Sequence, residues 1–187
     1  MGIIVSVLMG IILTMPTSSA AIWVAIATPV ITGAATSETE LYNIYLAGGA
    51  AVVGCACHMV GFAVMSFREN GVGGLISQGL GTSMLQIPNI MKKPILMLPP
   101  IISSAICGPL STCVFKLLCN ASGGGMGTSG LVGVFGVLSE ECISMQNPVM
   151  MWLGIVLLMF VLPVILNFGM SEFMRKRGLI KENDLKL

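Results

Sequence analysis

The residues with the clearest chemical potential form a short phrase that occurs twice. Residues 79–83 read Gly-Leu-Gly-Thr-Ser, and residues 125–129 read Gly-Met-Gly-Thr-Ser. Glycines let a backbone turn sharply and approach another group closely. Each Thr-Ser pair adds two hydroxyls that can donate and accept hydrogen bonds. Because both copies lie in otherwise apolar stretches, we expect them to form a polar, non-helical lining inside a membrane domain.

The side chains around the two copies could bind a small molecule. They carry hydroxyl or amide groups and no charge, and they are Thr82, Ser83, Gln86, Asn89, Thr128 and Ser129. A few converging polar groups in an apolar surround are typical of binding pockets, so this set suits a neutral, polyhydroxylated or otherwise polar molecule. Close packing of hairpins against spans is the alternative interpretation of the same glycines and hydroxyls.

The only histidine, His58, is a further candidate for the binding site. An imidazole inside a membrane span faces the bundle or a cavity rather than lipid. A neutral histidine that hydrogen-bonds to a neighbouring helix is the alternative. We interpret the six cysteines as small buried hydrophobic residues. With one histidine and one aspartate, Asp184, no Ser/His/Asp set can form, so we expect no catalysis by this chain, no metal and no cofactor.

The composition predicts an all-α membrane protein. Hydrophobic residues make up 55% of the 187 residues and charged residues 9%, whereas soluble domains are roughly 25% charged. The mean hydropathy is +0.95. The formal net charge of +1 provides no basic field to hold nucleic acid. We therefore expect membrane lipid as a partner and exclude nucleic acid.

The apolar segments must position these side chains, and three of them are long enough to cross a bilayer. A span needs about 20 residues, and residues 41–67, 94–118 and 148–170 meet that length. Residues 2–15 and 20–35 are each too short. They flank a Pro-Thr-Ser-Ser break, which fits a discontinuous helix or a tight hairpin, with two tilted spans as the alternative. This organisation predicts a membrane domain over residues 1–170 and a cytoplasmic tail over residues 171–187.

The charges predict which side each connection faces. Basic residues tend to stay in the cytoplasm, and those beside the apolar segments are Arg68, Lys92, Lys93, Arg175, Lys176 and Arg177. The acidic residues that then fall on the opposite side are Glu38, Glu40, Glu140 and Glu141. Residues 72–90 must in that case enter and leave on the cytoplasmic side, and residues 123–138 on the outer side. The chain is thus expected to be a helical bundle with two re-entrant hairpins in inverted orientation, whose meeting point is the site.

Three sequence blocks resemble a known family. Residues 61–70 (GFAVMSFREN), 79–90 (GLGTSMLQIPNI) and 125–133 (GMGTSGLVG) occur in the order found in the phosphotransferase-system EIIC-like integral membrane family, which includes perfringolysin O regulator-like proteins. The resemblance covers about residues 5–168. It implies a sugar-permease-like bundle in the bacterial plasma membrane. Since members are usually longer, it also implies a C-terminal half or truncated member, present as a homodimer or in complex with a separately encoded half.

The resemblance implies two alternative functions. In sugar-transporting EIIC proteins the second hairpin carries a glutamate, whereas residues 127–130 here read Gly-Thr-Ser-Gly, and Glu140 and Glu141 fall beyond the hairpin. The chain also contains no EIIA or EIIB segment. We therefore expect a transporter component that moves a neutral sugar or polyol without phosphorylating it. The alternative is a membrane-embedded sensor or regulator that acts through a cytoplasmic partner, either EIIA/EIIB-like or regulatory.

Overall fold

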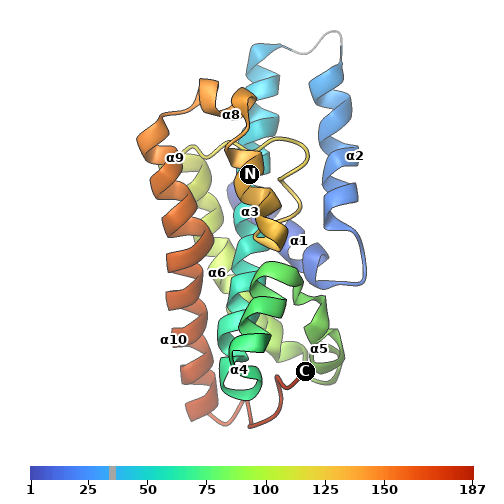
Figure 1. The fold of residues 1–187 in the computed structure, drawn as a ribbon, viewed down its shortest axis with the longest axis vertical. Helices are drawn as coiled ribbons and strands as arrows, with labels where there is room; N and C mark the ends of the chain where they lie inside the picture. The colour runs from blue at the N-terminus through green and yellow to red at the C-terminus, as the bar shows by residue number, and fades with distance from the viewer. Residues whose placement is uncertain (34–36) are drawn as a thin grey trace.

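The computed structural model describes residues 1–33 and 37–187, and all its regular elements are helical. Figure 1 shows an elongated bundle with α3 (Glu38–Met65) running through its centre. Ser37 begins this helix with a capping box, in which its hydroxyl accepts a hydrogen bond from the Glu40 N–H and the Glu40 carboxylate accepts one from the Ser37 N–H. Most of α3 is buried, so the other elements pack around it.

Within residues 1–33 and 37–187, three helical runs are long and apolar enough to cross a membrane: Glu38–Met65, Pro94–Val114 and Pro148–Lys176. Their positions agree with the three predicted spans. The second run consists of η3 (Pro94–Met97), α6 (Leu98–Pro109) and η4 (Leu110–Val114), and the third of α9 (Pro148–Gly154), η6 (Ile155–Val161) and α10 (Leu162–Lys176).

The third run continues past the predicted end at residue 170. Met174 is buried there, and Arg175 donates hydrogen bonds to the Glu69 carboxylate and to the Met65 carbonyl. These contacts bring the polar last turns of α10 back against α3 and α4, so the helix does not end where its hydropathy falls.

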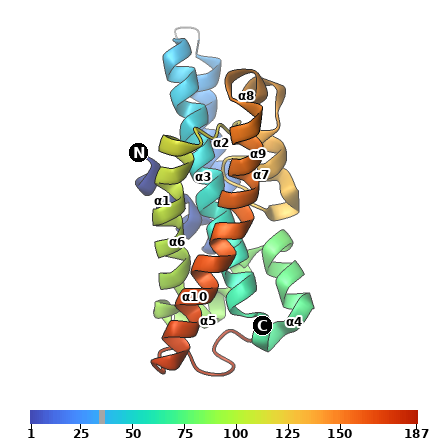
Figure 2. The ribbon, with the colours of Figure 1, turned by 90° about the vertical axis from the view of Figure 1, so that its left-hand side faces the viewer.

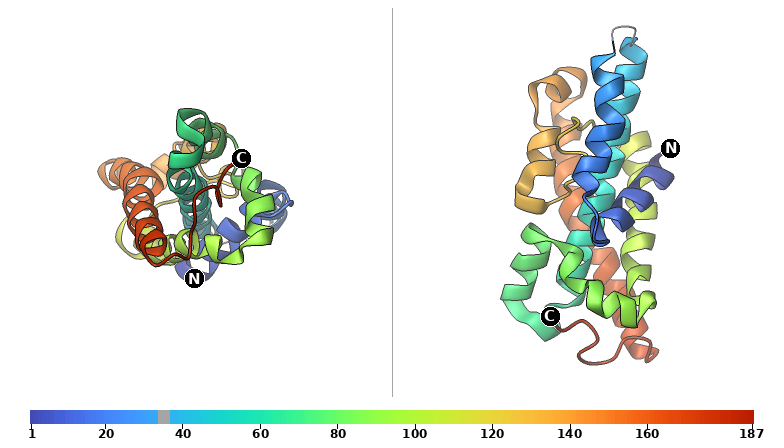
Figure 3. Two further views of the ribbon diagram at one scale, coloured as in Figure 1. Left: turned by 90° about the horizontal axis from the view of Figure 1, so that it is seen from below. Right: turned by 90° about the vertical axis from the view of Figure 1, so that its right-hand side faces the viewer.

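The first two apolar segments form a hairpin of short helices, α1 (Gly2–Thr14) and α2 (Ser19–Thr32). Both are below the length of a span. Ser18 caps α2 by accepting a hydrogen bond from the Ala21 N–H. The turn between the two helices lies between the ends of α3 rather than at either end of the bundle (Figures 1 and 3). The structure therefore favours the hairpin over two full spans; the last predicted residues of the second segment lie outside the described residues.

Two further segments leave one end of the bundle and return to it. α4 (Phe67–Ile76) and η1 (Ser77–Gly81) run from the lower end of α3 toward the middle, and η2 (Ser83–Gln86) and α5 (Ile87–Lys92) lead back (Figure 1). From the upper end, a loop descends to η5 (Ser129–Leu131), and α7 (Val132–Val137) and α8 (Glu140–Met145) return (Figure 1). The two segments enter the bundle from opposite ends, as the inverted arrangement predicts. That they enter a bilayer as re-entrant hairpins stays a prediction.

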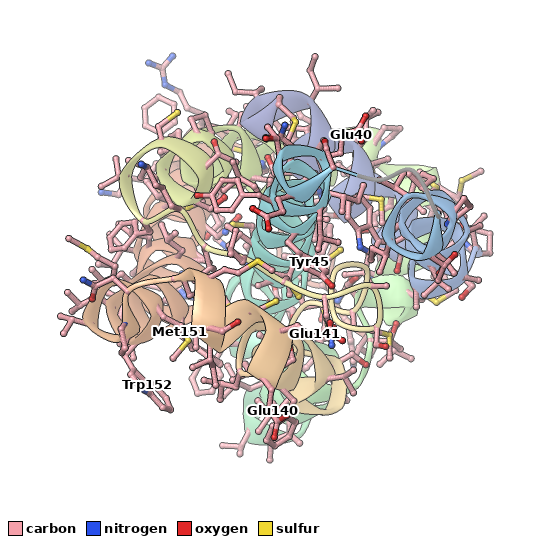
Figure 4. All side chains as sticks on the ribbon, turned by 90° about the horizontal axis from the view of Figure 1, so that it is seen from above. Glu40, Tyr45, Glu140, Glu141, Met151 and Trp152 are labelled. Carbon is pink, nitrogen blue, oxygen red and sulfur yellow. The ribbon has the colours of Figure 1, made fainter. Side chains whose placement is uncertain are left out.

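The two ends of the bundle differ in charge. We call the upper end the acidic end, after Glu38, Glu40, Glu140 and Glu141; Figure 4 looks onto it. There the Tyr45 hydroxyl donates a 3.0 Å hydrogen bond to Glu141. We call the lower end the basic end, after Arg68, Lys92, Lys93 and Arg175. This separation agrees with the predicted grouping of the charges.

The sides of the bundle are apolar and open. On α9, Met151 is 3% exposed and points into the bundle, while Trp152 is 54% exposed and points away from it (Figure 4). Ile26 on α2 and Phe168 on α10 are likewise exposed. Exposed aromatic and branched side chains between two polar ends suit contact with lipid acyl chains.

Candidate functional site

Three breaks in the helices gather at one level of the bundle. They are the α1–α2 turn, the end of η1 and the loop that leads to η5 (Figures 1 and 3). We call this region the junction and define it as residues 16–19, 79–83 and 125–129. The Ser19 hydroxyl donates a 2.6 Å hydrogen bond to the Gly125 carbonyl, which ties the first break to the third.

The two copies of the repeated phrase contact each other in the junction. Thr128 Oγ1 donates a 2.6 Å hydrogen bond to the Gly79 carbonyl, and Ser129 Oγ donates a 2.9 Å hydrogen bond to the Gly81 carbonyl. Both donors belong to the second copy and both acceptors to the first. The glycines thus supply backbone oxygens, and the hydroxyls are occupied in holding the two loops together.

The second copy is seated directly on α3. Gly127 has a φ of +57°, in the left-handed region that favours glycine. A Cβ added there would lie 2.8 Å from the backbone of Cys55 and of Ala56, so only a glycine allows this approach. Thr128 Oγ1 also lies 3.7 Å from the Met59 sulfur.

Two of the predicted site residues carry buried polar atoms with no partner. Within residues 1–33 and 37–187, neither Ser83 Oγ nor His58 Nε2 has a hydrogen-bond partner. His58 Nδ1 lies 3.1 Å from the Gly54 carbonyl on its own helix. An unpaired buried polar atom costs about 1–3 kcal/mol, so each marks a place where water or a ligand group gains a hydrogen bond. Thr82, by contrast, accepts a hydrogen bond from the Met84 N–H and shapes the turn.

Gln86 and Asn89 bind a different part of the chain from the two hydroxyl donors. Gln86 Nε2 donates a 3.0 Å hydrogen bond to the Leu185 carbonyl, and Asn89 Nδ2 donates a 2.9 Å hydrogen bond to the Lys186 carbonyl. The structure thus divides the predicted set into a group at the junction and a pair of amides turned toward the end of the chain.

Gln78 and Ser19 also lie at the site, although neither belongs to the predicted set of site residues. Gln78 is fully buried, donates a 2.6 Å hydrogen bond to Ser66 Oγ and accepts a 3.0 Å one from Gln86. Its position one residue before the repeated phrase, as an amide in an apolar stretch, was a signal for it. No sequence signal indicated that Ser19 contacts the second Gly-x-Gly-Thr-Ser loop, because its partner Gly125 lies 106 residues further along the chain.

The charged groups near the site all lie at the basic end. Arg175 binds both carboxylate oxygens of Glu69, at 2.8 and 3.1 Å, and the two side chains are only 12% and 6% exposed. Lys93 pairs with Asp184. Partial burial acts to raise the pKa of Asp184, but hydrogen bonds from Lys93 and from the Lys181 N–H outweigh it and hold this pKa below its usual value. Among the described residues, no three His, Cys, Asp or Glu side chains are placed to hold a metal ion.

An apolar groove of about 230 Å³ opens beside the junction. It lies between α3, the α4–η1 segment and the third span, and it is lined by Val60, Ala63, Val64, Leu75, Ile76, Gly79, Leu80, Phe160 and Val164. Such a lining suits an acyl chain rather than a polar solute. Beside this groove Thr128 and Ser129 bond to the carbonyls of Gly79 and Gly81, so the two loops are in contact in this structure.

Comparison with known proteins identifies the family. A family model described as "Phosphotransferase system, EIIC" matches residues 1–187. The chain belongs to this family. Neither the curated proteins nor the solved structures include a match to it. The EIIC family is membrane-bound, and its EIIC domain is the transporter domain rather than the phosphorylating component. The resemblance on the three sequence blocks is thereby confirmed, and this EIIC protein is a membrane protein whose described part contains three helices of spanning length.

Proposed function

We propose that this EIIC protein carries a neutral sugar or polyol through the junction between its two Gly-x-Gly-Thr-Ser loops. The observation behind the proposal is the pair of hydrogen bonds from Thr128 and Ser129 to glycine carbonyls of the first copy. A solute with several hydroxyls offers the same groups, because each of its hydroxyls both donates and accepts. It can therefore replace one loop as the partner of the other when the loops separate.

One unpaired atom in the loops supports the same solute class. Ser83 Oγ is buried and unpaired within the described part of the chain, so a polar solute near it would add a hydrogen bond that the junction lacks. His58 Nε2 is also buried and unpaired there, but the His58 ring lies against Gly10 of α1. The junction also carries no charged side chain, since residues 16–19, 79–83 and 125–129 are all uncharged. An ionic solute would find no counter-charge there and would pay its full desolvation cost.

In this proposal the two out-and-back segments are re-entrant hairpins in the bacterial plasma membrane, the basic end is cytoplasmic and the acidic end is outside. The charge separation between the two ends supports that orientation. Phosphorylation of the solute would need EIIA- or EIIB-like partners at the basic end. A second copy of the chain, or a separately encoded half, would cover the exposed apolar sides.

Uptake into proteoliposomes tests the proposal. Labelled hexoses and hexitols are supplied to vesicles that contain the wild type or Thr128→Val combined with Ser129→Ala. We expect at least one solute to enter faster than into empty vesicles, and the double variant to lose most of that uptake, because each lost hydrogen bond to the solute weakens binding by about 1 kcal/mol or more. Ser144→Ala is the matched control, because the Ser144 hydroxyl donates its hydrogen bond to the Glu141 carbonyl of its own helix, at the acidic end. Equal uptake by all three proteins would exclude the junction as the pathway.

The alternative function is a membrane sensor that acts through a partner. One feature favours it: Gln78, which directly precedes the first Gly-x-Gly-Thr-Ser loop, accepts a hydrogen bond from Gln86, and Gln86 also donates to the Leu185 carbonyl. Solute at the loop could thus alter what the basic end presents to a cytoplasmic protein. A partner whose capture requires residues 177–187, in a protein that transports none of the solutes, would support the sensor over the transporter.

A further inference from the structure

The last residues of the chain fold back under the basic end. α10 ends near Lys176, and Gly178, with a φ of +72°, reverses the chain direction. The N–H of Leu179 then bonds to the Met174 carbonyl at 2.9 Å, which closes the turn. Figures 2 and 3 show the following residues crossing the lower end from α10 toward α4 and α5. Composition alone marks this segment as a solvated tail, yet it is a packed element.

Leu185 anchors the segment. Its side chain is fully buried in a cluster with Phe62 and Met65 of α3, Ile90 of α5 and other apolar side chains. Leu187, two residues later, is 50% exposed. Among the last three residues, Leu185 therefore supplies the buried apolar contact. The exposed Leu187 is a matched control for substitutions of Leu185.

Three side-chain amides hold the backbone around this leucine. Asn70 Nδ2 and Gln86 Nε2 both donate to the Leu185 carbonyl, at 2.7 and 3.0 Å, and Asn89 Nδ2 donates to the Lys186 carbonyl at 2.9 Å. The Leu187 N–H returns a 2.9 Å hydrogen bond to Asn70 Oδ1. Amides from α4, η2 and α5 thus bind the turn of residues 182–185 and the two residues after it through main-chain groups.

An ion pair adds a charged contact to the same segment. Asp184 pairs with Lys93, and its carboxylate also accepts a 2.6 Å hydrogen bond from the Lys181 N–H. The segment therefore has an apolar anchor that packs against α3 and α5, a set of main-chain hydrogen bonds to amides of residues 70–89, and a charge pair with Lys93.

The geometry assigns residues 180–187 the role of a releasable latch, bound in a peptide site made by Asn70, Gln86, Asn89 and the pocket of Leu185. While bound, the latch covers Ile90. It also connects α4, which leads toward the first Gly-x-Gly-Thr-Ser loop, to η2 and α5, which lead away from that loop. Gln86 is three residues from Ser83, so release of the latch frees the arm that leads into the junction. If the proposed transport function holds, the bound latch inhibits transport.

Release is favoured by the composition of the segment. Apart from its two buried apolar side chains, Ile180 and Leu185, the segment is polar or exposed, so it remains soluble when detached. Fewer buried apolar side chains hold this segment in place than hold the three spans. Segments with few buried apolar contacts are the ones that open without global unfolding.

Labelling of a cysteine beneath the latch tests the inference. Ile90→Cys is introduced together with Cys113→Ser, which removes the one exposed native cysteine of the described chain. A membrane-impermeant maleimide is then applied to purified protein in detergent. We expect slow labelling with the latch intact, labelling at least ~10-fold faster with Leu185→Asp, and an unchanged rate with Leu187→Asp. Leu185→Ala should fall between the wild type and Leu185→Asp.

Addition of the latch in trans completes the test. A synthetic peptide of residues 178–187 should restore slow labelling to the Leu185→Asp protein, and the same peptide with Leu185→Asp should not. Equal labelling rates in all proteins would overturn the inference. So would loss of the helical circular dichroism signal in Leu185→Asp and Leu185→Ala, because the segment would then be an obligatory part of the fold. These readouts need no solute, so they are independent of the outcome of the transport experiment.

Discussion

Gly81 and Gly127 occupy the same position in the two copies of the repeated phrase, yet the structure gives them opposite tolerance to a side chain. Gly127 has a φ of +57°, and a Cβ there would lie 2.8 Å from atoms of Cys55 and Ala56. Gly81 has no atom within 4 Å of a Cβ, and its φ is outside the left-handed region. Gly127→Ala and Gly81→Ala therefore form a matched pair of one-methyl substitutions.

The expected cost at Gly127 has two sources. An alanine in the left-handed region costs about 1–2 kcal/mol. Close contact with the α3 backbone adds about 1–3 kcal/mol, because two of the three crowded atoms are main-chain atoms of a central helix and cannot rotate away. We expect Gly127→Ala to lower the free energy of unfolding by about 2–5 kcal/mol. Gly81→Ala should change it by less than about 1 kcal/mol.

Thermal unfolding in detergent, followed by circular dichroism, measures the difference. For a chain of this length the Gly127→Ala melting temperature should fall by roughly 5–15 °C, while the Gly81→Ala protein should melt within a few degrees of the wild type. If the strained loop instead lifts away from α3, Thr128 should lose its contact with Gly79 as well. Equal melting temperatures for the two variants would refute the assigned seating of the second loop on α3.

Two further predictions concern the basic end. Glu69→Gln should destabilise the protein by about 3–5 kcal/mol, because it leaves the guanidinium of Arg175 without its buried partner. Arg68→Gln, which breaks a pair whose arginine is 60% exposed, should cost less than about 1 kcal/mol in the same unfolding assay. The pKa of Asp184 is depressed in the folded protein, so its contribution to latch binding is present above its usual pKa and is lost as the pH falls through the depressed value. The labelling rate of Ile90→Cys, divided by that of a free thiol at the same pH because maleimide reacts with the thiolate, should thus stay low between pH 7 and 5 and rise below a pH of about 3.8, and Asp184→Asn should remove that rise.

Much of the fold could be predicted from local properties of the chain. Hydropathy and length indicate the three spans because a helix in lipid needs a continuous apolar run. The Pro-Thr-Ser-Ser break predicts the α1–α2 turn, because proline cannot continue a helix and nearby hydroxyls can cap the next one. The position of the charges separates the two ends, since charged side chains stay outside the hydrocarbon region.

The candidate site was predicted only in part. The repeated phrase indicates Thr128 and Ser129 by residue type, but the sequence does not show that their partners are the carbonyls of Gly79 and Gly81, 49 and 48 residues away. Gln86 and Asn89 carry suitable amides, yet these bind a segment about 100 residues further along the chain. An amide or hydroxyl satisfies its hydrogen bonds with whichever group packing brings within reach.

The sequence by itself determined an all-helical membrane protein with a repeated polar loop and oppositely charged ends, because apolar length, helix breakers and charge act over a few neighbouring residues. The sequence also predicted that the two loops meet, but only the tertiary structure decided which groups join them and that residues 180–187 cover the basic end. The fully buried Leu185 lies in the segment that composition marks as the most polar of the chain. Its burial depends on a cavity formed by residues from three distant elements, and no local pattern encodes that cavity.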